Sequence, residues 1–169
     1  FRGVVDLLTW KAIIWADELG TVTQEIAVPA EVETEAWMAR EAMIESIVET
    51  DDGLTERYLE GEEIAEVDLR AALRKATLRG DLQPVLCGSA LRNKGVQLLL
   101  NAIVDFLPSP VDIPPVRGKN PKKDTIEERP ADPEAPLAAL VFKIATDPYV
   151  GRLAYFRVYS GKISRGNVY

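Results

Sequence analysis

Histidine is absent from the 169-residue sequence, and cysteine occurs once, as Cys87. Without histidine the chain cannot form the Ser-His or Cys-His pairs that activate nucleophiles, and most zinc chemistry is excluded too. A single cysteine excludes an internal disulfide and any site built from several thiolates. Because Cys87 ends the apolar run 84–87, we expect an inert thiol in a core. Neither catalytic residues nor metal ligands are predicted.

Long apolar runs are missing as well. No stretch approaches the roughly 18 residues of a membrane span, and no basic and apolar leader is present, so we expect a cytoplasmic protein without a membrane partner. A composition of 47% hydrophobic and 28% charged residues is typical of one or two soluble domains. Because the sequence starts at Phe1 and stops at Tyr169 within strand-like residues, we expect an excised piece of a longer protein.

The first half of the chain predicts strands and then helices. Residues 3–8, 12–15 and 22–28 favour strands, with a turn at Asp17 to Gly20. Apolar residues at helical spacing then predict a long helix over 30–50, a short one over 54–59 and a third that ends at Arg79-Gly80. The buried stripe expected on the long helix is Val32, Ala36, Ala39, Met43 and Ile47.

Residues 84–110 are typical of a βα unit. The run 84–87 predicts an interior strand, residues 88–90 form a small-residue loop, and 93–107 predicts an amphipathic helix with Asn93 as its N-cap. In open α/β sheets, ligands bind at the loops that follow the strands. The loop over 88–90 is therefore a candidate site. The apolar face expected on the helix is Val96, Leu99, Leu100, Ile103, Val104 and Leu107.

Proline separates the two ends of the chain. Eight of the eleven prolines lie between Pro108 and Pro136, which predicts an extended connector without regular helix or central strand. Beyond it the sequence predicts β-strands over 140–144 and 152–159, with a turn at Ser160-Gly161.

Several motifs resemble those of translation elongation factor G, a translational GTPase. They are Cys87-Gly88-Ser89-Ala90, Asn93-Lys94-Gly95-Val96, Phe106-Leu107-Pro108-Ser109-Pro110 and Asp147-Pro148-Tyr149-Val150-Gly151. The resemblance implies an α/β fold, in which an α+β insertion stands on a P-loop GTPase-type G domain remnant, followed by the first strands of an all-β barrel. The implied divisions are a G′ insertion over 1–83, the end of the G domain over 84–107, a connector over 108–136 and a truncated domain II over 137–169.

In that family the Ser-Ala pair is the last of five guanine-nucleotide motifs. The resemblance implies that the Ala90 N–H donates to the guanine O6, that Ser89 shapes the loop and that Leu91 lies beside the base. GTP or GDP with Mg²⁺ would be bound by the full-length protein. No cofactor and no activity are expected of this piece, because GxxxxGK[ST] and NKxD are absent and Asp17 to Gly20 matches DxxG only by chance.

Charge is concentrated in the helical region. Between Glu31 and Asp68 stand 14 acidic and two basic residues, a net charge of −12, whereas the whole chain carries −7. Such helices are either merely solvated or attract a basic protein surface. The resemblance implies docking to the C-terminal domain of the ribosomal stalk protein. The carboxylates expected to make that contact are Glu35, Glu41, Glu45 and Glu49.

The resemblance also implies that domain II packs on the small ribosomal subunit. Candidate rRNA-facing residues are Arg152, Arg157, Lys162 and Arg165, although the solubility of a strand edge explains such residues about as well. The implied function of the full-length protein is ribosomal translocation of tRNA and mRNA. The alternatives are a recycling-specialised paralogue, a relative of the peptide release factor three type, or a non-catalytic protein-binding module.

Overall fold

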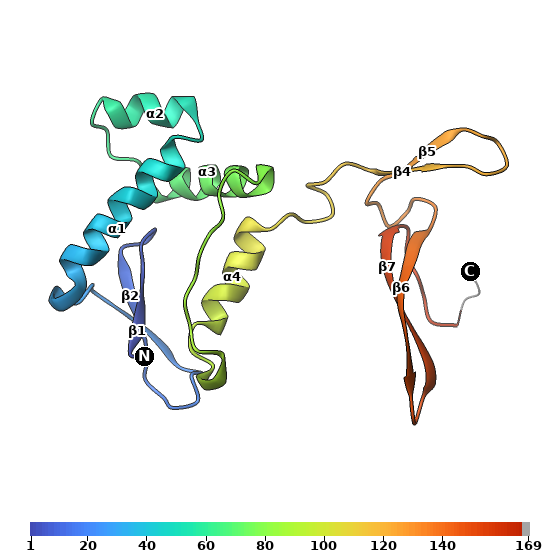
Figure 1. Cartoon of the computed structure of the whole chain (residues 1–169), viewed down its shortest axis with the longest axis horizontal. Coiled ribbons are helices and arrows are strands. Elements are labelled where there is room, and N and C mark those ends of the chain that lie inside the picture. The colour runs from blue at the N-terminus through green and yellow to red at the C-terminus, as the bar shows by residue number, and fades with distance from the viewer. Residues whose placement is uncertain (167–169) are drawn as a thin grey trace. The chain divides into compact units, whose positions relative to one another are not determined.

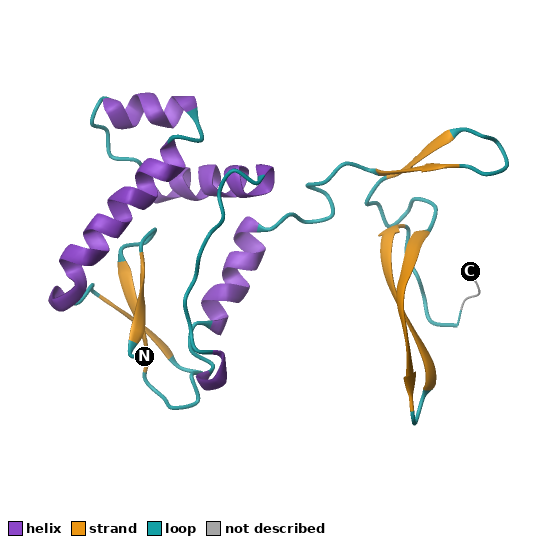
Figure 2. Ribbon diagram, viewed as in Figure 1, coloured by secondary structure: helices purple, strands orange, loops and turns teal. Residues whose placement is uncertain are grey.

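The chain folds into two compact units, Phe1–Leu107 and Pro108–Tyr169, in a computed structural model that describes residues 1–166 (Figure 1). Over that range the fold is α+β, with small antiparallel sheets and four α-helices (Figure 2). The last residues of the expected domain II segment, 167–169, lie outside the described residues.

An antiparallel meander opens the first unit, as the sequence predicts. Its strands are β1 (Gly3–Asp6), β2 (Lys11–Trp15) and β3 (Thr23–Ile26), paired in that order. The central strand β2 is the most buried, and its Ala12, Ile13 and Trp15 belong to the core. The three predicted strands are therefore confirmed, each with slightly different bounds.

Three helices follow the meander: α1 (Ala30–Val48), α2 (Asp52–Leu59) and α3 (Glu66–Arg79). All three are confirmed, and α3 ends at Gly80 in the left-handed conformation, as predicted. The predicted stripe on α1 is wrong at Ala39, which is exposed. Arg40 instead faces the turn between β1 and β2, where its guanidinium donates to the carbonyl oxygens of Leu7 and Leu8.

The core of the first unit lies between the helices. Figure 1 shows α3 beside both α1 and α4 (Val96–Phe106), and α3 packs against both. Leu69 of α3 is fully buried at the centre. The buried cluster comprises Ile47, Val48, Leu54, Ile64, Leu69, Ala72, Leu73 and Phe106.

The predicted amphipathic helix after the small-residue loop is present as α4, but it differs in two respects. Its N-cap is Gly95, not Asn93, so the helix begins two residues later than an Asn93 N-cap predicts. Its expected apolar face is also largely exposed, with Val104 at 78%, because no described element covers it. The residues of this exposed face are Leu99, Leu100, Ile103, Val104 and Leu107.

The interior strand predicted over 84–87 is wrong. Within residues 1–166 no strand pairs with this segment, which is extended, and Val85 is 93% exposed. Cys87 is exposed too, so it is not an inert core thiol. An apolar run becomes a buried strand only where neighbouring strands and helices cover it, and the described residues supply neither.

Two antiparallel hairpins make up the described part of the second unit. The strands β6 (Ala138–Asp147) and β7 (Gly151–Ser160) confirm the two strands predicted there. The expected connector, however, contains a hairpin of β4 (Val116–Lys119) and β5 (Ile126–Arg129) that the sequence does not predict. The two strands can pair because 116–119 and 126–129 contain no proline, and Pro121 lies in the turn between them.

Candidate functional site

The small-residue loop closes on itself between residues 87 and 95. Ser89 and Lys94 form an antiparallel bridge, with Ser89 N–H donating to the Lys94 carbonyl at 2.7 Å and Lys94 N–H donating back at 3.0 Å. Gly88 and Gly95 pack face to face, and a Cβ on Gly95 would lie 2.9 Å from the Gly88 Cα. Glycine is required here because the two backbone segments touch.

Between the bridging residues the chain makes one turn of 3₁₀ helix, Ala90–Arg92, and Asn93 then adopts the left-handed conformation. Within residues 1–166 no acceptor takes the N–H of Ala90 or of Leu91. Leu91 is 98% exposed, and Ser89 is half-buried. The three residues predicted to form a guanine loop therefore lie together on one open turn, with two backbone donors available.

The loop is anchored to the turn after β2, a contact that the sequence did not suggest. The side-chain amide of Asn93 donates to the carbonyl oxygens of Leu19 and Gly20 at 3.3 Å each, and Gln97 donates to Gly20 at 2.8 Å. Gly20 has a φ of +67°, and a Cβ there would lie 2.5 Å from the Arg92 carbonyl oxygen. Asn93 thus links the loop to the turn instead of capping α4.

Asp17 holds that turn in shape. Its carboxylate accepts from the Thr21 hydroxyl at 2.7 Å, from the Thr21 N–H at 3.0 Å and from the Val22 N–H at 2.8 Å. These hydrogen bonds, led by that of the Thr21 hydroxyl, lower the pKa of Asp17 to about 2. Residues 17–20, which match DxxG, thus form a structural turn, and the carbonyl oxygen of its Gly20 accepts hydrogen bonds from Asn93 and Gln97.

The acidic residues predicted to bind a partner all belong to the exposed side of α1 or to its end. Glu35, Glu41, Glu45 and Glu49 are exposed to solvent. In the described part of the chain, neither Glu35 nor Glu41 nor Glu49 has an ion-pair or hydrogen-bond partner, and Glu45 only accepts from the Tyr58 hydroxyl at 3.5 Å. The negative charge on this part of α1 is therefore left free.

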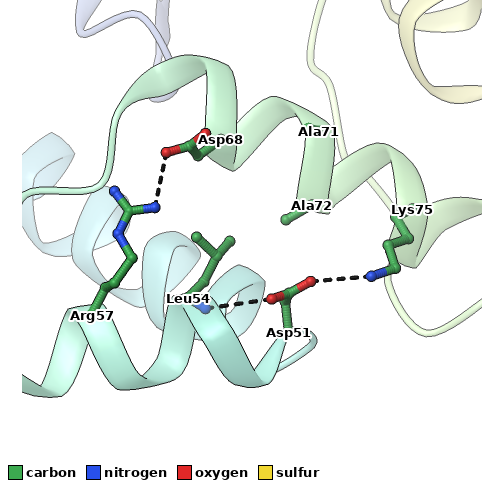
Figure 3. A pocket seen from close by; sticks show the side chains of 7 residues that line it. All are labelled: Asp51, Leu54, Arg57, Asp68, Ala71, Ala72 and Lys75. Atoms are coloured by element: carbon green, nitrogen blue, oxygen red, sulfur yellow. Dashed lines mark hydrogen bonds and ion pairs between the residues drawn. The ribbon is translucent and has the colours of Figure 1, made fainter.

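Four carboxylates of α3 and of the segments beside α2 are instead paired within the fold, namely Asp51, Glu62, Glu66 and Asp68. Arg57 contacts Glu62 at 3.0 Å and Asp68 at 3.1 Å, and Lys75 contacts Asp51 at 3.1 Å. Two of these pairs line a shallow pocket of about 220 Å³ between α2 and α3, where Figure 3 shows Arg57 and Lys75 each turned toward its carboxylate. These two ion pairs connect α3 to α2 and to its N-cap Asp51, and the Arg57 and Lys75 side chains are already paired with carboxylates.

Basic residues predicted to face rRNA do not gather on one face of the second unit. Arg152 and Arg157 stand five residues apart on β7, and every β7 residue between them is paired because the extra residue of the bulge is on β6, so the two side chains lie on opposite faces of the hairpin. Lys162 contacts Glu134 at 2.7 Å, and Arg165 is exposed beyond the strand.

Metal ligands and membrane spans are not found in the described part of the chain. No three Cys, Asp or Glu side chains among residues 1–166 are grouped so as to hold a metal ion. No helix in this range is long and apolar enough to cross a membrane.

No protein-family model matches the sequence. Among solved structures, a crystal structure of a protein from Thermus thermophilus is similar to this chain, with 35% sequence identity and a TM-score of 0.72. The similarity covers 98% of this chain and 22% of the Thermus protein, so the chain spans about a fifth of the length of that protein.

Proposed function

We propose that this chain is part of a translational GTPase that resembles elongation factor G, and that its own function is to dock a basic partner, the C-terminal domain of the ribosomal stalk protein. The observation that carries the proposal is the group of exposed, unpaired carboxylates along α1 and at its end. Asp51, Glu62 and the two carboxylates of α3 are paired internally, whereas Glu35, Glu41 and Glu49 have no partner among the described residues. Unpaired surface carboxylates attract a cationic surface from a distance.

The loop over 88–95 supports the same assignment by a separate observation. The free N–H of Ala90 is the donor that a guanine O6 needs, and the small residues Gly88 and Ser89 before it let a base edge approach the backbone. Such a loop supplies about one hydrogen bond, worth roughly 1 kcal/mol net. Because the sequence lacks a phosphate loop, this chain alone should neither retain GTP nor hydrolyse it, and the full-length protein would perform translocation.

A calorimetric titration of the 169-residue chain with the stalk C-terminal domain tests the docking proposal. Binding should weaken as salt is raised and should disappear in a Glu41→Lys and Glu49→Lys double variant. The matched control is Glu60→Lys with Glu63→Lys, which changes the net charge equally in the same unit but away from α1.

Binding in the control but not in the α1 variant would support the docking face. Equal loss of binding in both variants would mean that only the net charge matters and would contradict a specific docking face. Absence of binding heat with the wild-type chain would refute docking. GTP turnover above a protein-free blank would contradict the proposed absence of activity.

A further inference from the structure

We infer that Trp37 and Met38 form the contact at which the docked partner gains its affinity, and that the partner presents an apolar centre surrounded by lysine or arginine. This inference rests on the proposed docking function and specifies the chemistry of the surface that α1 recognises. It starts from two large apolar side chains on a charged helix, because Trp37 is 51% and Met38 60% exposed.

Met38 lies on the side of α1 that faces away from the core, and Trp37 lies at the border of the core side, where its ring contacts Trp10. Residues three and four apart are neighbours on a helix, so Thr34, Trp37, Met38 and Glu41 form one contiguous surface. The core side is formed by other positions, of which Ala36 and Ile47 are buried. The apolar patch of Trp37 and Met38 is thus set among exposed carboxylates, and Glu41 adjoins both residues.

Trp37 is held in place before any partner arrives. Its ring meets the ring of Trp10 edge to face, with centroids 5.8 Å apart and planes at 86°. Trp10 itself has a φ of +56° and carries the Arg40 guanidinium 5.8 Å from its ring centroid. A bulky residue in the left-handed region is a backbone outlier that only the surrounding contacts maintain.

A fixed aromatic side chain loses little entropy on binding, and Trp is among the residues most enriched in the positions that dominate interface energies. Met38 beside it is flexible and polarisable, and such a side chain adapts to a partner surface. Glu35 and Glu41 near the patch have no cation of their own among the described residues, so the complementary rim is basic. An apolar centre with a charged rim is the usual anatomy of a transient interface.

The carboxylates should govern the association rate constant, whereas the apolar patch should govern the dissociation rate constant, and this difference provides the test. Association of the 169-residue chain with the stalk C-terminal domain is measured by surface plasmon resonance at two salt concentrations. Met38→Ala and Trp37→Ala should each raise the dissociation rate constant about tenfold and leave the association rate constant within about twofold. Glu41→Gln should lower the association rate constant and its salt dependence instead.

Leu59→Ala serves as the matched control, because Leu59 is an exposed apolar residue of α2 outside the patch, and it should change neither constant. Thermal unfolding checks that Trp37→Ala is still folded, and Met38→Ala tests the same patch without the contact to Trp10. Binding by both patch variants with wild-type dissociation rates would overturn the inference and leave the docking proposal intact.

Absence of binding by the wild-type chain would instead refute the docking proposal itself. Concentration-dependent dimerisation of the wild-type chain, lost in both patch variants, would also overturn the inference, because the occupant of the patch would then be a second copy of this chain.

Discussion

Substituting Gly20 by alanine should destabilise the first unit more than an equivalent change at Gly61. Both glycines have positive φ, +67° and +80°, so alanine at either site is strained by about 1 kcal/mol. The surroundings differ, because nothing lies within 4 Å of a Cβ at Gly61, whereas a Cβ at Gly20 would lie 2.5 Å from the Arg92 carbonyl oxygen and 2.6 Å from that of Asn93.

The clash at Gly20 involves backbone, which cannot rotate away as a side chain would. Forced overlap of this kind costs about 1–3 kcal/mol. We therefore expect Gly20→Ala to lower the free energy of unfolding by about 2–4 kcal/mol and Gly61→Ala by about 1 kcal/mol.

Urea denaturation monitored by tryptophan fluorescence measures the difference in the free energy of unfolding. All three tryptophans belong to the first unit, so the fluorescence does not report on the hairpins of the second unit. Hydrogen exchange at the amides of Ser89 and Lys94 then reports whether the loop has opened locally. Equal destabilisation by the two substitutions would refute the close packing of the turn on the loop.

Two further predictions concern single side chains. Because hydrogen bonds lower the pKa of Asp17 from its ordinary 3.8 to about 2, its contribution to stability is present above pH 3.8 and is lost as the pH falls toward 2. Thr21→Val should move the NMR titration midpoint of Asp17 back toward 3.8, and a midpoint that stays near 2 would show that the Thr21 hydroxyl is not the main cause. Cys87, being exposed, should react completely with a thiol reagent in the absence of denaturant, with Cys87→Ser as the blank. Labelling only after urea is added would mean that the thiol is buried.

Local patterns predicted the elements of this chain well. Apolar spacing located α1 and α3, and Gly80 fixed the end of α3, because these signals depend on neighbours within one or two turns. The valine and isoleucine runs likewise located the meander and the β6 to β7 hairpin.

Long-range contacts escaped the same reasoning. The segment 84–87 has the composition of an interior strand, yet burial depends on elements distant in the sequence, and none of those described covers it. Asn93 is a good N-cap residue by type, but its amide is used on the carbonyl oxygens of Leu19 and Gly20. Arg40 of α1 faces the turn between β1 and β2 because two carbonyl oxygens of that turn accept from its guanidinium, a contact that no periodicity reveals.

For the candidate sites too, the sequence predicted local properties but not long-range contacts. Sequence placed Ser89, Ala90 and Leu91 on a loop and the four glutamates on an exposed helical surface, both of which are local properties. Arg57 and Lys75 neutralise Asp68 and Asp51 across the contact between α2 and α3, so only the structure distinguishes these paired carboxylates from the unpaired ones of α1.

The hydrogen bond from Gln97 to Gly20 joins residues 77 positions apart, and this separation matters while the chain is being made. At about 5–20 residues per second, the turn after β2 leaves the peptidyl transferase centre roughly 4–15 s before its partner loop is complete. During that interval nothing from residues 88–97 is available to hold it. Asp17 provides the local substitute, because its carboxylate organises the turn through Thr21 and Val22 alone. In the nascent chain these local hydrogen bonds can form the turn at residues 17–22 before the loop at 88–97 has been synthesised.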